Sequence, residues 1–224
     1  MGLPVLVIGP SGAGKTYGLK NFKPEEVGVI GVEKSRLPFR SKMKPVSVPD
    51  FSENKDSSPA QINAARYSWI ENLLKRQTLS YAIDDSQYLL ANELFDRKNE
   101  KNYDKFTDMA ANFRNLIHYV NKNVDDDKIV YFLHHVEEGA DGRKKAKTIG
   151  KMLDEKLVIE GCFNIVLYCE DHKFYTQANG TSTAKTPERM FSEIEIPNDL
   201  KAVDTAIRDY YDMKPNNTEG NKED

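Results

Sequence analysis

A glycine-rich loop near the start of the chain restricts the possible folds more than any other feature of the sequence. Residues 9–16 read Gly-Pro-Ser-Gly-Ala-Gly-Lys-Thr, which matches the Walker A pattern at every fixed position. The apolar run 5–8 before the loop predicts a buried strand, and the residues after it, up to about Asn21, are expected to form a helix. A strand, a phosphate-binding loop and a helix in this order predict an α/β fold.

The residues of this loop have distinct expected roles around a nucleoside triphosphate. Its glycines allow consecutive backbone N–H groups to turn toward an anion. Lys15 is expected to reach the β- and γ-phosphates, and Thr16 to place its hydroxyl on Mg²⁺. The loop therefore predicts a nucleoside triphosphate with Mg²⁺, and we take ATP and Mg²⁺ as the expected cofactors. The predicted nucleotide-binding residues are Gly9, Pro10, Ser11, Gly12, Ala13, Gly14, Lys15, Thr16 and Tyr17.

The rest of the chain alternates apolar runs with amphipathic segments, which predicts a mainly parallel central sheet with helices on both faces. Its 224 residues suit one domain, expected over residues 1–211 and followed by a disordered acidic tail over 212–224. A charged stretch at 137–147 is expected to be a mobile loop. Further strands are expected at 27–32, 46–48, 79–83, 129–133, 164–168 and 174–177, and helices at 59–77, 88–95, 104–123, 149–159 and 199–211.

Composition excludes a bulk polycation and a membrane-spanning protein. The formal net charge is −3, so any contact with nucleic acid must come from a local basic patch. The stretch 137–147, with Arg143, Lys144, Lys145 and Lys147, could be such a patch or simply a solvated charge run. No apolar run reaches the length of a membrane span, and we expect a cytoplasmic protein without membrane contact.

Two carboxylates follow the expected strand at 79–83, as in a Walker B motif. Asp84 is expected to bind the Mg²⁺ shell, directly or through water. Asp85 stands where many P-loop ATPases carry a glutamate, and it is either a catalytic residue or part of an Asp-rich turn. Because the carboxyl ends of parallel strands share one edge of a sheet, both side chains should lie near the phosphate loop.

Four further polar residues are candidates for a role at the nucleotide site. Glu33 ends the second expected strand and is either the group that orients and deprotonates water or a solvated loop residue. His134 and His135 end the fourth long strand. Adjacent strand residues point to opposite faces, so only one of these should sense the γ-phosphate, and we favour His135. The alternative is that both are simply hydrogen-bonded polar residues at the strand end. Lys185 is a candidate cation for the nucleotide of a neighbouring subunit.

A resemblance to a known family is carried by residues 9–16, 29–33 with 37–39, 83–86, His135 with 148–151, and 184–187. In these stretches the chain resembles the phage-encoded RecA-like P-loop ATPases of recombination and replication modules. The resemblance implies a RecA-like P-loop NTPase fold, Glu33 as the catalytic base, and a cation such as Lys185 from the adjacent subunit. It also implies ATP hydrolysis stimulated by single-stranded DNA, assembly into rings or filaments, cooperation with a single-strand binding protein, and work in the host cytoplasm.

Two other functions stay open at this point. A P-loop kinase of a small molecule or nucleotide would share the phosphate loop, but such kinases usually carry an arginine-rich lid, and Arg143 is the only arginine in the candidate lid at 137–147. A nucleotide-gated binding module that recruits a helicase, as a loader does, would bind ATP with very slow turnover. For the ATPase, catalytic roles are predicted for Lys15, Glu33, Asp85, His135 and Lys185.

Overall fold

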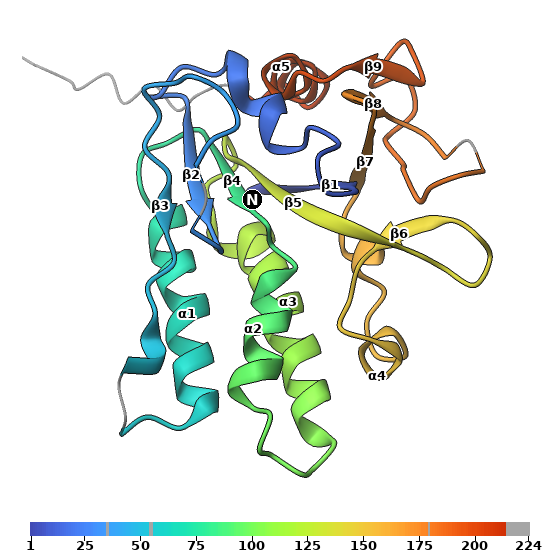
Figure 1. Cartoon of the computed structure of the whole chain (residues 1–224). Helices are drawn as coiled ribbons and strands as arrows, with labels where there is room; N and C mark the ends of the chain where they lie inside the picture. Colours follow the sequence, from blue (N-terminus) through green and yellow to red (C-terminus); the bar gives the residue numbers. More distant parts are fainter. Residues whose placement is uncertain (35, 54–55, 179, 214–224) are drawn as a thin grey trace, which may run out of the picture.

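The computed structural model of the chain describes residues 1–34, 36–53, 56–178 and 180–213, which form an α/β fold around one sheet. The strand order is β3-β2-β4-β5-β1-β7-β8-β9, and β6 pairs with β5 (Figure 1). The strands are β1 (Leu3–Gly9), β2 (Val27–Gly31), β3 (Val46–Ser47), β4 (Ser80–Asp84), β5 (Ile129–Glu138), β6 (Lys144–Ala146), β7 (Ile165–Glu170), β8 (Lys173–Tyr175) and β9 (Glu195–Pro197).

Most neighbouring strands run parallel. The strand that leads into the phosphate loop, β1, lies between β5 and β7 and is parallel to both. Beyond β5 the parallel sheet continues through β4, β2 and β3, whereas β8 and β9 add antiparallel strands beyond β7. The carboxyl ends of β1, β4 and β5 therefore meet at one edge, where ligands bind in sheets of this kind.

Helices cover both faces of the sheet. Along β1, Leu6 and Ile8 belong to one hydrophobic cluster with Phe113 of α3, whereas Val5 and Val7 belong to a second cluster that includes α5. Figure 1 shows α1, α2 and α3 together on one side and α5 on the other. Side chains alternate along a strand, so a strand buried on both faces feeds both clusters. The helices are α1 (Pro59–Leu74), α2 (Tyr88–Asp96), α3 (Asp104–Asn123), α4 (Lys151–Asp154) and α5 (Leu200–Tyr210), with 3₁₀ helices η1 (Thr16–Asn21), η2 (Phe51–Glu53) and η3 (Ile159–Cys162).

Local sequence signals explain where two of these helices begin. The Ser58 hydroxyl accepts a hydrogen bond from the Gln61 N–H, the Gln61 side chain accepts one from the Ser58 N–H, and Pro59 occupies the first helical position of α1. At α5, the Asp199 carboxylate accepts hydrogen bonds from two N–H groups of the first turn. Each such cap stabilises its helix by about 1 kcal/mol.

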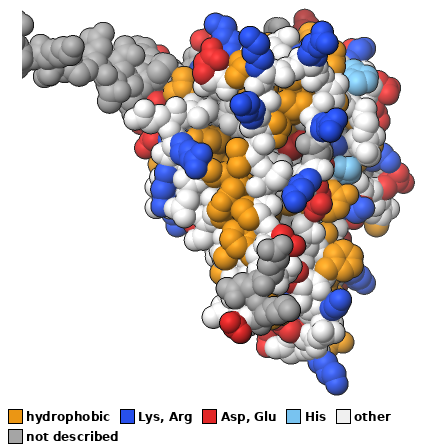
Figure 2. Space-filling model, turned by 60° about the vertical axis from the view of Figure 1, so that its left-hand side comes forward, with side chains coloured by type: hydrophobic (Ala, Val, Ile, Leu, Met, Phe, Trp, Pro, Cys, Tyr) orange, Lys and Arg blue, Asp and Glu red, His pale blue; other side chains and the backbone are white. Residues whose placement is uncertain are grey.

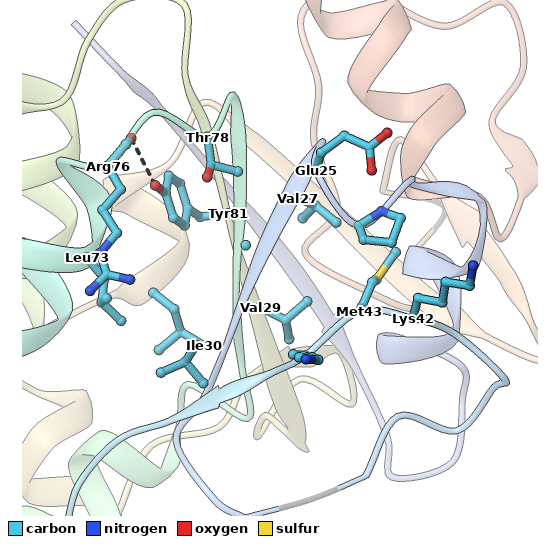
Figure 3. Close-up of a pocket in the computed structure, with 14 residues that line it drawn as sticks. Glu25, Val27, Val29, Ile30, Lys42, Met43, Leu73, Arg76, Thr78 and Tyr81 are labelled. Carbon is cyan, nitrogen blue, oxygen red and sulfur yellow. Dashed lines mark hydrogen bonds between the residues drawn. The ribbon is translucent and has the colours of Figure 1, made fainter.

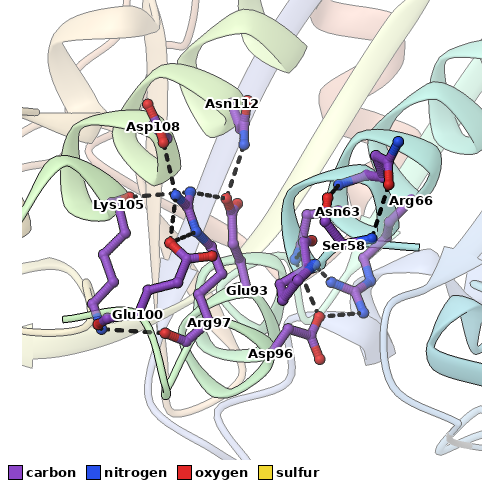
Figure 4. Close-up of polar contacts among 12 residues, drawn as sticks. Ser58, Asn63, Arg66, Glu93, Asp96, Arg97, Glu100, Lys105, Asp108 and Asn112 are labelled. Atoms are coloured by element: carbon purple, nitrogen blue, oxygen red, sulfur yellow. Dashed lines mark hydrogen bonds and ion pairs between the residues drawn. The ribbon is translucent and has the colours of Figure 1, made fainter. Parts of the chain in front are cut away.

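A polar network fixes α2 between α1 and α3. Arg97, directly after α2, forms ion pairs with the buried Glu93 at 3.3 Å and with Asp108 of α3 at 2.7 Å (Figure 4). On the other side of α2, Asp96 forms an ion pair with Arg66 of α1 at 3.1 Å. Removing one member of a buried pair leaves an uncompensated charge, so these contacts hold the helix in one position. In that position α2 contributes Tyr88 to the pocket beside the phosphate loop and Asn92 to the pocket that Glu33 lines.

The structure confirms a mainly parallel sheet with helices on both faces, but it corrects the loop expected at 137–147. There β5 continues to Glu138 and pairs with β6 in an antiparallel hairpin that sets Glu138 opposite Lys144. Gly142 adopts a φ of 77° at the turn, a conformation that suits glycine. Opposite charges that face each other across the two strands stabilise the hairpin. A high density of charged residues at 137–147 is therefore compatible with regular strands.

Other expected elements also differ. The helix expected at 149–159 is replaced by the short helices α4 and η3, and the segment after the phosphate loop is the 3₁₀ helix η1. A Cβ at Gly18 would lie 2.5 Å from Asn198 Oδ1, so this glycine allows η1 to pack closely against the chain beyond β9. Strand β9 was not expected. Met213, in the expected tail, packs against the second cluster, and residues 214–224 lie outside the described residues.

Among the described helices, none has the length and apolar character needed to span a membrane.

Candidate nucleotide-binding site

The phosphate loop forms one wall of a pocket of about 550 Å³ at the carboxyl edge of the sheet. Asp84 and Asp85 at the end of β4, and His135 on β5, form a second wall. Arg36 and His172 complete it from more distant parts of the chain. The volume lies in the range of small-molecule and cofactor sites.

Lys15 is buried at the base of this pocket. Its Nζ donates hydrogen bonds to the carbonyl oxygens of Gly9 at 2.7 Å and Pro10 at 2.8 Å, and the residue is only 6 % exposed. Burial lowers the pKa of its ammonium group. Carbonyl oxygens of the loop thus accept hydrogen bonds from the ammonium group of Lys15. A bound phosphate would be a stronger, charge-assisted partner for that group.

Two residues from the antiparallel end of the sheet, His172 and Asn198, hold the conformation of the phosphate loop. Gly14 has a φ of 105°, and a Cβ there would lie 2.3 Å from Asn198 Nδ2 and 2.7 Å from His172 Nδ1. Asn198 Nδ2 donates a hydrogen bond to the Gly14 carbonyl at 2.9 Å, and the His172 N–H donates one to the Ala13 carbonyl at 3.1 Å. The glycine is therefore required both by its backbone conformation and by the close approach of these side chains.

Thr16 and Asp84 meet at the pocket wall. Thr16 Oγ1 donates a hydrogen bond to Asp84 Oδ1 at 2.8 Å. Asp84 is 5 % exposed, and burial raises the pKa of its carboxyl group to about 6. Among the described residues, no group of three or more His, Cys, Asp or Glu could hold a metal ion. A hydroxyl and one carboxylate beside a phosphate loop fit Mg²⁺, which takes its other ligands from water and phosphate oxygens.

Asp85 and His135 form a pair in the same pocket. Asp85 has a φ of 59°, which turns the backbone sharply at the end of β4. His135 Nε2 donates a hydrogen bond to Asp85 Oδ1 at 3.2 Å, and this bond lowers the pKa of the Asp85 carboxyl group. The His135 ring also meets the Tyr88 ring edge-on, with 6.3 Å between the centroids. Asp85 therefore stays ionised and orients the His135 ring through this hydrogen bond.

His134 points to the opposite face of β5. It is fully buried, and its Nε2 donates a hydrogen bond to the Lys147 carbonyl at 2.7 Å, which leaves Nδ1 to face Ser86 Oγ at 2.9 Å. Burial lowers the pKa of His134 to about 4, so its ring is neutral. Of the two histidines, His135 is therefore the one that lines the pocket, as expected from the alternation of side chains along a strand.

Glu33 and Lys185 do not line the phosphate-loop pocket. Glu33 lies beyond the end of β2, where its Oε1 accepts a hydrogen bond from Asn92 Nδ2 of α2 at 3.0 Å, and it lines a separate pocket. Lys185 is exposed, and its backbone pairs with Val166 of β7. The structure thus brings together Lys15, Thr16, Asp84, Asp85 and His135, but not these two predicted residues.

Four residues that line this pocket were not predicted as site residues from the sequence. Arg36 and Pro38 come from the irregular segment after β2, Tyr88 from the start of α2, and His172 from the tight turn between β7 and β8. Of these, only Pro38 lies in a stretch that carries the resemblance, and His172 reaches the loop only because β7 pairs with β1. An arginine shortly after a strand end was the single usable signal for Arg36.

In comparisons with models of known protein families and with curated proteins, nothing matches this chain. Its function must therefore be inferred from the chemistry of the pocket.

Proposed function

We propose that this chain binds ATP with Mg²⁺ and hydrolyses it, as a RecA-like P-loop ATPase. The observation that carries the proposal is the hydrogen bond from Thr16 Oγ1 to Asp84 Oδ1. It brings both expected Mg²⁺ ligands together beside the buried Lys15. When bound, Mg²⁺ would neutralise charge on the phosphate oxygens, and Lys15 would bind the same phosphates through its ammonium group.

Hydrolysis also requires a group that orients and deprotonates water. We assign this role to Glu33, which must leave the amide of Asn92 to reach the pocket. The pair of Asp85 and His135 already lies beside the phosphate loop, where it would sense the γ-phosphate. In this assignment, the resting state keeps the base away from the nucleotide.

The proposal includes action on single-stranded DNA within a ring or filament, together with a single-strand binding protein. The exposed Lys185 would act on the nucleotide of a neighbouring subunit. A kinase receives less support, because the expected lid at 137–147 is a hairpin whose only arginine, Arg143, pairs with Asp141 at 3.7 Å.

ATP turnover measured with and without Mg²⁺ and single-stranded DNA tests this function. We expect Mg²⁺-dependent release of inorganic phosphate that DNA accelerates and that Lys15→Ala abolishes. Transfer of the phosphoryl group to a nucleoside or nucleotide would instead identify a kinase. ATP binding with negligible turnover, together with binding of a replication helicase, would favour the loader-type module.

A further inference from the structure

The segment between β2 and β3 carries a concentration of positive charge that is unusual for this chain. Residues 36–44, called the basic strip below, contain four cationic side chains and no acidic one, although the whole chain has a net charge of −3. All four cationic residues are exposed. They are Arg36, Arg40, Lys42 and Lys44.

The basic strip is held in place by apolar side chains that point inward. Leu37 and Phe39 pack against the second hydrophobic cluster, and Met43 is buried within it. The Phe39 ring meets the Tyr17 ring edge-on, with 6.2 Å between the centroids. Tyr17 directly follows the phosphate loop, so the strip is packed onto the nucleotide site.

Within the described part of the chain, the four cationic side chains of the strip form no ion pair or hydrogen bond. The hairpin of β5 and β6, where the sequence suggested a nucleic-acid contact, is different. There Lys144 pairs with Glu138 at 2.6 Å, and Lys145 pairs with both Glu137 and Asp154 at about 3 Å. Charges that are already neutralised attract a polyanion weakly, so the strip is the stronger candidate.

The two ends of the strip reach two different pockets. Arg36 lines the phosphate-loop pocket. Lys42 and Lys44 line a second pocket of about 340 Å³ at the edge of β2, together with Arg76 and one acidic residue, Glu25 (Figure 3). Its lining also includes the apolar side chains of Val29, Met43 and Leu73. Figure 2 shows this side of the molecule, where Lys and Arg side chains surround a stripe of hydrophobic side chains.

We propose that the basic strip binds the backbone of single-stranded DNA and that the pocket at the edge of β2 takes an unpaired base. This inference rests on the proposed function and names its DNA-binding surface. A row of exposed cations spread over residues 36–44 suits a linear polyanion rather than one phosphate ion. A pocket beside the row that combines apolar and cationic side chains suits a base that is not paired, which a single strand offers and a duplex does not.

Fluorescence anisotropy with a labelled oligothymidylate of roughly 15 nucleotides, measured without added ATP, tests this DNA-binding surface. The variant is Lys42→Ala with Lys44→Ala, and the matched control is Lys144→Ala with Lys145→Ala in the hairpin. We expect the strip variant to bind about tenfold more weakly or worse. The slope of log affinity against log salt concentration should fall by about 1.4, because each phosphate contact on a single strand contributes about 0.7.

The hairpin variant should bind like the unmodified chain, and Lys15→Ala should retain DNA binding while losing ATP turnover. Equal loss in the hairpin variant, equally tight binding of a duplex, or equally tight binding of polyglutamate would overturn the proposal. Absence of DNA binding in a chain that still hydrolyses ATP would also overturn it, but would leave the ATPase assignment intact. Lys42 and Lys44 are exposed and Lys144 and Lys145 are partly exposed, and unchanged thermal unfolding of both variants confirms that the fold is kept.

Discussion

The Thr16 hydroxyl donates a hydrogen bond to the Asp84 carboxylate at 2.8 Å, joining two motifs that lie 68 residues apart. Because these are the proposed Mg²⁺ ligands, Thr16→Ala and Asp84→Asn should each remove the dependence of ATP affinity on Mg²⁺. We expect the affinity measured with Mg²⁺ to fall by about tenfold or more, which corresponds to roughly 1.4 kcal/mol. Isothermal titration with ATP, with and without Mg²⁺, measures this effect. Thr16→Ser keeps the hydroxyl and is the matched control; a loss as large as that of Thr16→Ala would argue against a hydroxyl ligand.

A second prediction separates binding from folding at Lys15. Its ammonium group is buried, and its hydrogen-bond partners among the described residues are carbonyl oxygens of its own loop, so it stabilises the fold little without a phosphate. Lys15→Ala should therefore unfold at a temperature close to that of the unmodified chain. The increase in unfolding temperature on adding ATP and Mg²⁺ should disappear. A variant that unfolds at a much lower temperature without nucleotide would show that Lys15 has a structural role instead.

Sequence reasoning found the parts of the site that are local in the chain. The phosphate loop and the carboxylates after β4 could be identified because each follows an apolar strand at a fixed spacing. The amphipathic helix α3 was expected at its observed bounds, because Phe113 and its apolar neighbours recur at a helical period. Contacts between distant segments could not be found in this way. Asn198 contacts Gly14 across 184 residues, and only the pairing of β7, β8 and β9 brings them together.

The position of Glu33 illustrates a second limit. A strand end places a residue at an edge of the sheet, but the direction of its side chain depends on the partner that it finds, which is Asn92 on α2. The same applies to the basic stretch at 137–147, where partners across the hairpin neutralise charges that look solvated in the sequence.

A third prediction tests Glu33 as the base. Glu33→Gln should keep ATP affinity while lowering the turnover rate by about 100-fold, the scale of a lost general base. Asn92→Ala removes only the hydrogen bond that holds Glu33 away from the pocket, so its turnover rate should equal or exceed that of the unmodified chain. Phosphate release under saturating ATP measures both. Undiminished turnover in Glu33→Gln would remove Glu33 from the catalytic role, and Asp85→Asn would be the next variant to examine.

A fourth prediction concerns Arg36, which lines the phosphate-loop pocket from the basic strip. A guanidinium group beside bound phosphates contributes charge-assisted hydrogen bonds worth about 1.5–3 kcal/mol. Arg36→Ala should therefore weaken ATP affinity by about tenfold or more. Arg40→Ala is the matched control, because Arg40 is exposed on the same strip but does not line that pocket. Equal loss of ATP affinity in both variants would indicate a general effect of positive charge.

The last prediction follows from His134, whose pKa burial lowers to about 4 from an ordinary value near 6.5. Between these values the unfolded chain takes up a proton that the folded chain does not, so the free energy of unfolding must decrease as the pH falls. The decrease attributable to His134 should approach roughly 3 kcal/mol by pH 4, since one pKa unit corresponds to about 1.4 kcal/mol.

Urea unfolding of the unmodified chain and of His134→Gln at pH 7 and at about pH 4.5 measures this contribution. The variant should be less stable at pH 7, because Ser86 and the Lys147 carbonyl lose a well-placed partner, but its stability should decrease less on acidification. Asp84 acts in the opposite direction, since the pKa of its buried carboxyl is raised, but it does so equally in both proteins and cancels in the comparison. If the two proteins lose the same free energy between these pH values, His134 is already protonated in the folded chain and the buried, neutral imidazole described above is wrong.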